Sequence, residues 1–285
     1  MVVHAIATQH GPASEAAQRS IEQARLAGNH GLVEKISGTL SSFALLGPMP
    51  VLQAIAQCES AIADGMSDRQ VECSIMCALA QLKAMNGELE AARLLYRRGR
   101  AVLHDLGQGL NAAATGLDLA RVELHGGDLA MAEREVRADY DFLVGIGETY
   151  YLSTMAALLS RVVRDQGRDD EALVLSKIAE EATSPDDIES QALWRSIRAP
   201  IVARAGNMAL AEELARTALD YLRPTNMPSL QADALIELAS VLKLAGRTGE
   251  CRQIIDEAFA LYSAKGNIVL TARSASLGAD LAGVG

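Results

Sequence analysis

Glycine recurs at an almost constant interval along this 285-residue chain. The interval is 40 residues with a single gap of 39, and the glycines that define it are Gly47, Gly87, Gly127, Gly167, Gly206 and Gly246. A fixed period of about 20–50 residues indicates a repeat protein, in which each unit packs on its neighbours. The sequence therefore predicts a stacked scaffold without a single compact centre.

Each unit reads as two helices joined by its glycine. Before Gly87, apolar residues recur at helical spacing over residues 69–86, and a second amphipathic pattern begins at Leu89. Glycine ends a helix readily because it adopts the left-handed conformation at little cost, and Asp128 and Asn207 are placed to cap the helix that follows. Further breakers lie between the periodic glycines and predict looser turns at Gly65, Gly107, Gly145 with Gly147, Pro185, Pro224 and Gly266.

Composition and charge exclude several classes of protein. Apolar residues make up 49% of the chain and aromatic residues only 4%, which favours an ordered, all-α protein rich in small side chains. The formal net charge of −10 argues against direct binding to nucleic acid or to an anionic membrane. No apolar run is long enough to span a membrane, and the chain starts without a signal peptide, so we expect a cytoplasmic protein.

Small residues hold fixed places relative to the periodic glycines. They stand seven residues before the glycine, five after it and twelve after it, as in Ala199, Ala211 and Ala218 around Gly206. With these offsets the chain resembles the tetratricopeptide repeat family, although the period is about 40 residues and a large aromatic near the start of the first helix is mostly absent. HEAT-type repeats share the period and are the alternative, but the alanine offsets favour the tetratricopeptide family. The resemblance implies a right-handed superhelical solenoid of antiparallel helix pairs.

The resemblance covers nearly the whole chain, which we predict to be one domain, residues 1–285. Repeats of this length occur in the sensor regions of bacterial regulators such as the maltose-regulon activator. The closing segment, residues 234–267, looks like the C-terminal repeats of bacterial proteins that carry a class III cyclase or an ATPase module. The predicted division is a partial repeat at 1–28, repeats at 29–66, 67–107, 108–147, 148–185, 186–225 and 226–266, and a C-terminal capping helix at 267–285.

The chain contains no catalytic or cofactor-binding motif. The Ser-nucleophile, zinc-protease, dinucleotide and P-loop signatures are all missing, so we expect neither enzymatic activity nor a cofactor. Cys73 and Cys77 are four residues apart and could form half of a metal site, but two small residues packed in the stack is the favoured interpretation, and no metal is expected.

A stripe of basic residues is predicted along the concave face. In the tetratricopeptide family this face is lined by the first helix of each pair, and the corresponding positions here include Arg121, His125, Arg161, Arg164 and Arg204. Guanidinium groups suit carboxylates and phosphates, so the stripe predicts a partner with acidic groups. The alternative is that these arginines pair with nearby acids such as Asp118 and Asp165 in a solvated network.

Two further features fall in the fifth repeat. Trp194, the only tryptophan, either fills space between layers or anchors a ligand in the groove. Pro200 lies inside a helical pattern, in the unit with the short gap, and Arg198 stands there in place of leucine. These irregularities are either a tolerated defect or the shape of a pocket.

The function predicted from these observations is recognition. We expect a non-enzymatic scaffold or regulatory module of a bacterial signalling or transcription-control system, which binds a protein or peptide along its groove. The alternative is a sensor domain in which a small effector lodges in the groove and changes the curvature of the superhelix.

Overall fold

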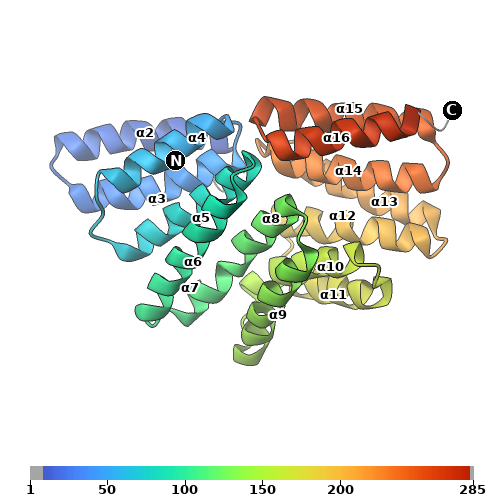
Figure 1. Cartoon of the computed structure of the whole chain (residues 1–285), viewed down its shortest axis with the longest axis horizontal. Helices are drawn as coiled ribbons and strands as arrows, with labels where there is room; N and C mark the ends of the chain where they lie inside the picture. The colour runs from blue at the N-terminus through green and yellow to red at the C-terminus, as the bar shows by residue number, and fades with distance from the viewer. Residues whose placement is uncertain (1–8, 283–285) are drawn as a thin grey trace.

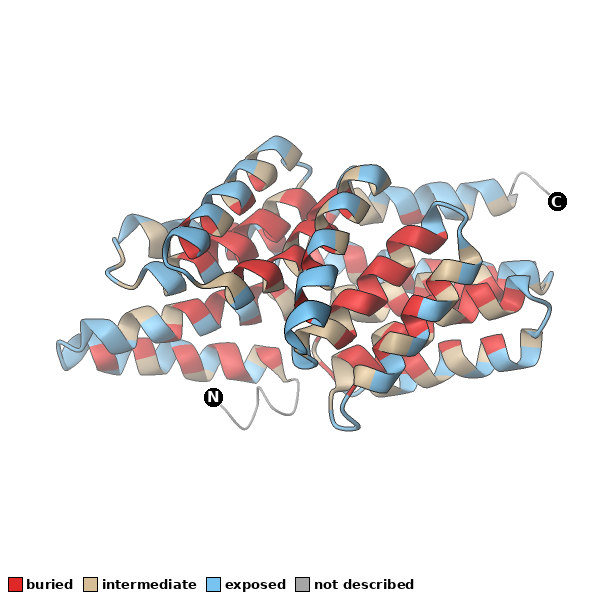
Figure 2. Ribbon diagram, turned by 90° about the horizontal axis from the view of Figure 1, so that it is seen from below, coloured by how far each residue is buried: buried red, intermediate tan, exposed pale blue. Residues whose placement is uncertain are grey.

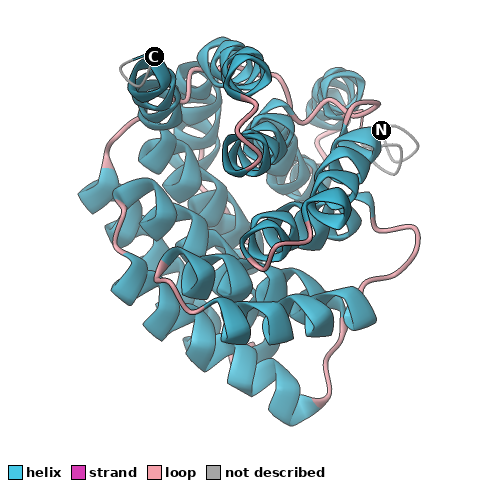
Figure 3. Cartoon of the chain, turned by 90° about the vertical axis from the view of Figure 1, so that its right-hand side faces the viewer, coloured by secondary structure: helices cyan, strands magenta, loops and turns pink. Residues whose placement is uncertain are grey.

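The computed structural model describes residues 9–282, which fold into helices joined by short turns, without a strand in that range (Figures 1 and 3). Residues 1–8 of the predicted partial repeat and residues 283–285 of the predicted cap lie outside the described residues. Within 9–282, no helix combines the length and the apolar character that crossing a bilayer requires. The helices are α2 (His10–Leu26), α3 (His30–Leu46), α4 (Val51–Ala63), α5 (Arg69–Met85), α6 (Leu89–Asp105), α7 (Gly109–Ala114), α8 (Gly116–Gly126), α9 (Leu129–Ile146), α10 (Tyr150–Asp165), α11 (Asp169–Ala182), α12 (Ile188–Arg204), α13 (Met208–Leu222), α14 (Pro228–Leu244), α15 (Thr248–Lys265) and α16 (Ile268–Ala282).

The turns follow the expected chemistry. Gly127 ends α8 in the left-handed conformation with φ 76°, and the side chain of Asp128 then accepts a hydrogen bond from Met131 N at 2.9 Å, which caps α9. Gly47 differs from the other periodic glycines because its φ is −79°. Glycine is needed here because there is no room for a side chain: a Cβ at position 47 would lie 2.9 Å from the Cβ of His10.

One predicted helix is broken in two. The first helix of unit 108–147 was expected to run without interruption, but α7 and α8 meet at Thr115, whose hydroxyl donates to the carbonyl of Ala112 at 2.6 Å. The residue that follows is Gly116, and a Cβ on it would lie 2.2 Å from Asp139 Oδ2. Asp139 is held there by two hydrogen bonds from Arg100. The break therefore accompanies a partly buried ion pair that the periodicity did not reveal.

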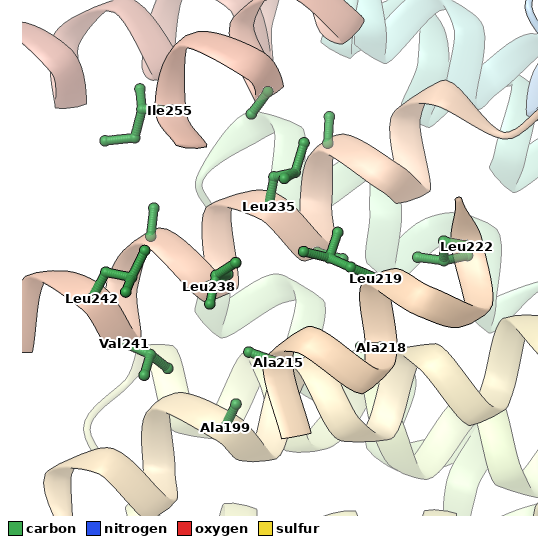
Figure 4. Close-up of a cluster of buried hydrophobic side chains, with 14 of the residues drawn as sticks. Ala199, Ala215, Ala218, Leu219, Leu222, Leu235, Leu238, Val241, Leu242 and Ile255 are labelled. Atoms are coloured by element: carbon green, nitrogen blue, oxygen red, sulfur yellow. The ribbon is translucent and has the colours of Figure 1, made fainter. Parts of the chain in front are cut away.

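The core is distributed along the stack. Buried positions recur along the helices rather than gathering at one centre (Figure 2), and the buried apolar side chains form separate clusters, each shared by neighbouring helices. Figure 4 shows the cluster in which Ala199, Ala215 and Ala218 face leucines of α13 and α14. These alanines have no exposed surface, as expected where helices approach closely.

The two ends of the stack meet. Figure 1 shows α15 and α16 next to α4 and α5, and the side chain of Lys265 reaches into the turn between α3 and α4. The sequence did not predict this contact, because neighbour-to-neighbour packing says nothing about how far the stack curves. As a result, α3, α5, α8, α10, α14 and α16 face one another across the inside of the molecule.

Candidate functional site

A small pocket lies where these six helices face one another, and we call it the inner pocket. Its volume is about 60 Å³, and it is lined by side chains from both ends and from the middle of the chain. Its apolar wall comes from leucines and a methionine of α3, α5, α8, α14 and α16. Its charged and hydrogen-bonding side chains include Arg121, His125, Arg161, Asp233, Asn267 and Arg273.

Arg161 is the least satisfied cation of the inner pocket. Its Nη1 lies 3.8 Å from Asp233 Oδ2 and its Nε lies 4.0 Å from Asp165 Oδ2, both beyond hydrogen-bond length. The Nε atom is buried and has no hydrogen-bond partner among the described residues. A buried guanidinium N–H without an acceptor is costly, so an acceptor from a ligand would be stabilised there.

Arg273 brings a second cation from the last helix. It donates to the backbone carbonyls of Leu124 at 2.8 Å and His125 at 2.5 Å, and within residues 9–282 it forms no ion pair. Burial, followed by the charge of Arg161, lowers the pKa of Arg273. Two guanidinium groups thus act on each other. The pocket's one lining carboxylate, that of Asp233, accepts a hydrogen bond from the hydroxyl of Tyr262 and lies 3.8 Å from Arg161 Nη1.

Arg121 completes the group, but it is already paired. Its Nη2 donates to Glu189 Oε1 of α12 at 2.7 Å. The three arginines and one aspartate that line the pocket give it a formal charge of +2 when His125 is neutral. The inner pocket is therefore locally basic in a protein whose net charge is −10.

His125 is held as the neutral ring by its two neighbours. Nδ1 lies 2.7 Å from the carbonyl of Arg121, so it carries the proton and donates it, while Nε2 accepts from Asn267 Nδ2 at 3.1 Å. The side-chain amide of Asn267 is fixed in this orientation, because its Oδ1 accepts a hydrogen bond from Leu270 N at 3.1 Å and caps α16. Burial lowers the pKa of His125, which agrees with the neutral form.

The other residues predicted for the groove lie outside the inner pocket. Arg164 is buried and makes two hydrogen bonds of 2.8 Å to Glu237, and Arg204 makes two of 2.6 Å to Asp169. Trp194 is 3% exposed, with the guanidinium of Arg198 4.4 Å from its ring centroid on α12. Of the six predicted side chains, the structure brings together Arg121, His125 and Arg161.

The irregular residues of the fifth unit, Pro200 and Arg198, lie at contacts between helices. Helix α12 continues through Pro200, which lacks the N–H that would bond to Ser196. The carbonyl of the next residue, Ile197, accepts from Arg164 Nη1 at 3.2 Å. Arg198 donates to Ser176 and Glu180 of α11. These residues therefore hold α10, α11 and α12 together.

The cysteines are part of the packing. Cys73 is 1% exposed and lies 3.4 Å from the carbonyl of Gly99, and Cys77 is also buried. Burial, together with the charge of Asp118, raises the pKa of the Cys77 thiol. Among residues 9–282, no three His, Cys, Asp or Glu side chains are grouped as metal binding requires.

Sequence reasoning missed Asp233, Asn267 and Arg273. They belong to α14 and to the predicted cap, and they reach the pocket because the ends of the stack meet. Asn267 carried a usable signal, since asparagine directly before an apolar helix is a capping residue. Nothing in the repeat pattern indicated that its other amide atom would bind His125.

Comparison with known proteins yields structural similarity only. No protein-family model and no curated protein matches the chain. The structure of NprR in complex with its cognate peptide NprX matches with 13% identity over 95% of this chain and 81% of that one, with a TM-score of 0.62. The apo form of the quorum sensor NprR from B. thuringiensis matches with 15% identity over 91% and 80%, with a TM-score of 0.52.

A third match is a signal transduction ATPase with numerous domains, which has a tetratricopeptide repeat sensor, from Pyrococcus horikoshii. Identity is 11%, the TM-score is 0.50, and the match covers 94% of this chain but only 47% of the ATPase. Identities this low show the fold alone. The tetratricopeptide-type, all-α repeat fold that the sequence predicted is thereby confirmed.

Proposed function

We propose that this chain, which has a tetratricopeptide-type repeat fold, is a non-enzymatic regulatory module that binds a peptide or protein segment through an acidic group held in the inner pocket. The observation that carries the proposal is the incomplete pairing of Arg161. Its buried Nε has no acceptor, and Arg273 beside it has no carboxylate partner among the described residues. A carboxylate placed between them would accept hydrogen bonds from both guanidinium groups.

The size of the pocket limits what enters it. A volume of about 60 Å³ exceeds the roughly 10–15 Å³ that one water molecule needs, and it is far below the roughly 300 Å³ at which pockets for drug-sized ligands begin. That volume suits a carboxylate and not the body of a peptide. We therefore propose that an Asp or Glu side chain, or a free C-terminus, enters the inner pocket while the rest of the segment lies outside it.

The similarity to NprR in complex with its cognate peptide supports a peptide as the ligand, and the similarity to the ATPase with a tetratricopeptide repeat sensor supports a regulatory role. We propose that the protein works in the cytoplasm as part of a bacterial signalling or transcription-control system. In this proposal, residues 29–266 are six successive binding-scaffold repeats and residues 267–285 are a cap that also supplies Asn267 and Arg273 to the pocket.

A second candidate is a small carboxylic acid as effector. The small volume of the inner pocket favours it, because a small acid would fill the pocket without an extended groove. The two candidates differ in whether a free acid such as acetate or succinate competes with the peptide.

An array of seven-residue peptides tests the proposed function. We expect enrichment of peptides with Asp, Glu or a free C-terminus, and loss of binding when the C-terminal group is amidated in peptides without acidic side chains. Arg161→Gln should weaken binding at least tenfold. The matched control is Arg204→Gln, which removes an arginine that lies outside the pocket and pairs with Asp169, and it should bind as wild type does. Equal binding by both variants would contradict the proposal.

A further inference from the structure

The turn between α15 and α16 closes the molecule through a buried lysine. Lys265 is 1% exposed, and its Nζ donates at 2.7 Å to each of three backbone carbonyls, those of Ala44, Gly47 and Met49. These carbonyls belong to the end of α3 and the turn before α4, more than 200 residues earlier in the chain. No carboxylate among the described residues lies within 4.0 Å of Nζ, so three peptide dipoles alone satisfy the ammonium group.

A glycine lies on each side of the contact that Lys265 makes. Gly266 adopts φ 78°, and a Cβ on it would lie 3.5 Å from Val51 N. On the opposite side, Gly47 leaves room for His10 at the start of α2. The start of α2, the α3–α4 turn and the α15–α16 turn thus meet at one point.

A second contact joins the last helix to α8 in the middle of the chain. Asn267 donates to Nε2 of His125, and Arg273 donates to the carbonyls of Leu124 and His125 on α8. Both contacts depend on the same α15–α16 turn. Together they place α16 across the inner pocket, to which it contributes Asn267, Leu270 and Arg273.

We infer that the α15–α16 turn is a latch: Lys265 in the α3–α4 turn, with Asn267 and Arg273 on α8, holds the superhelix closed over the inner pocket, and release of the latch admits the ligand. This inference rests on the proposed function for the identity of the ligand, but closure itself is a property of the chain alone. A ligand carboxylate bound to Arg161 and Arg273 would favour the closed state, because Arg273 reaches the pocket only when α16 lies on α8.

Protonation acts on the latch at the His125 contact. Burial lowers the pKa of His125, and a proton on its Nε2 would face the amide donor of Asn267. Burial also lowers the pKa of Lys265, but its three bonds to carbonyls use all three N–H donors of the charged form, so the lysine contact is made by the ammonium group. At His125 the closed state binds fewer protons than the open state, so protonation of this ring favours opening. The charged and titratable groups that face these two side chains are His10 of α2, Arg121 of α8, Arg161 of α10, Asp233 of α14 and Arg273 of α16.

The latch is tested without a ligand by Lys265→Met, with Lys177→Met on the exposed face of α11 as the matched control. We expect Lys265→Met to raise the radius of gyration in X-ray scattering. It should also speed amide hydrogen exchange by at least tenfold both at residues 44–51 and at residues 121–126, which Lys265 does not touch. Lys177→Met should change neither quantity. Unchanged scattering, or faster exchange at 44–51 alone, would overturn the inference.

A disulfide tests the same point if Lys265→Met fails to fold. A Cβ at position 266 would lie 3.8 Å from the Cβ of Val51, which is the separation of a disulfide, so Val51→Cys with Gly266→Cys should lock the ends together. The single Gly266→Cys variant controls for strain at the positive φ. The probe is a fluorescein-labelled Gly-Gly-Glu-Glu peptide with a free C-terminus.

Oxidation of the double variant should slow association of this peptide at least tenfold, and reduction should restore it. Equal association rates in the two redox states would overturn the latch. If the peptide binds neither form nor wild type, the proposed ligand is wrong, and the scattering and exchange of the oxidised and reduced forms still decide whether the turn holds the ends together.

Discussion

The buried ion pair between Arg164 and Glu237 offers a sharp test of how the stack is held together. The pair joins α10 to α14 across α12, and both side chains are 8% exposed. Glu237→Leu would leave the guanidinium buried with Asp165 at 2.8 Å and the Ile197 carbonyl at 3.2 Å as its remaining partners. Removing one partner of a buried pair costs about 3–5 kcal/mol, and because two partners remain we expect about 3 kcal/mol of lost stability.

Urea unfolding followed by tryptophan fluorescence measures this loss. Trp194 is the only tryptophan, and it lies in α12 between the two helices that the pair joins, so it reports on this part of the stack. With a denaturant slope of about 3 kcal/mol/M, the midpoint should fall by about 1 M. The free energy of unfolding of the double variant Arg164→Leu with Glu237→Leu should lie within about 1 kcal/mol of that of the wild type, because no unpaired charge remains.

The partly exposed Arg204–Asp169 pair supplies the control, for which Arg204→Gln should cost at most about 1 kcal/mol of stability. If Glu237→Leu costs no more than this control, the reasoning is wrong.

Three further predictions follow from particular side chains. Gly116→Ala should lower the thermal unfolding temperature by several degrees because its Cβ would overlap Asp139, whereas Gly145→Ala, in open space on α9, should leave it unchanged or raise it. Burial raises the pKa of all four cysteine thiols, that of Cys58 to about 12. A thiol reagent at pH 8 should therefore label none of them in the folded protein and all four in guanidinium chloride. Fast labelling of the native protein would contradict this burial. The lowered pKa of His125 predicts that the closed state loses stability as the pH falls below about 6.5, because the ring must then be protonated, so the radius of gyration should grow from pH 8 to pH 5. A radius that shrinks on acidification would contradict this prediction.

The repeat period was sufficient to predict the class of fold. The glycine interval and the small-residue offsets depend on contacts between adjacent helices, and such contacts leave a local pattern in the sequence. The caps at Asp128 and Asn207 are formed as expected, because capping is a property of a few consecutive residues. The break at Thr115 was not predicted because its cause, the Arg100–Asp139 pair, comes from other helices.

The candidate site was predicted only in part for a similar reason. Arg121, His125 and Arg161 occupy successive first helices, so their place on the inner face could be inferred from the period. Whether an arginine there is free or paired depends on acids that are distant in the sequence, such as Glu237 for Arg164 and Asp169 for Arg204. Lys265 and Arg273 act where the stack curves back on itself, and that curvature is the sum of many small rotations between repeats.

A crystal structure with a peptide enriched on the array would test the central claim most directly. We predict a carboxylate of the peptide within hydrogen-bond distance of Arg161 Nε and of the Arg273 guanidinium, with α16 still resting on α8. A peptide bound on the outer helices, with the inner pocket unchanged and Arg161 Nε still without a partner, would contradict the account.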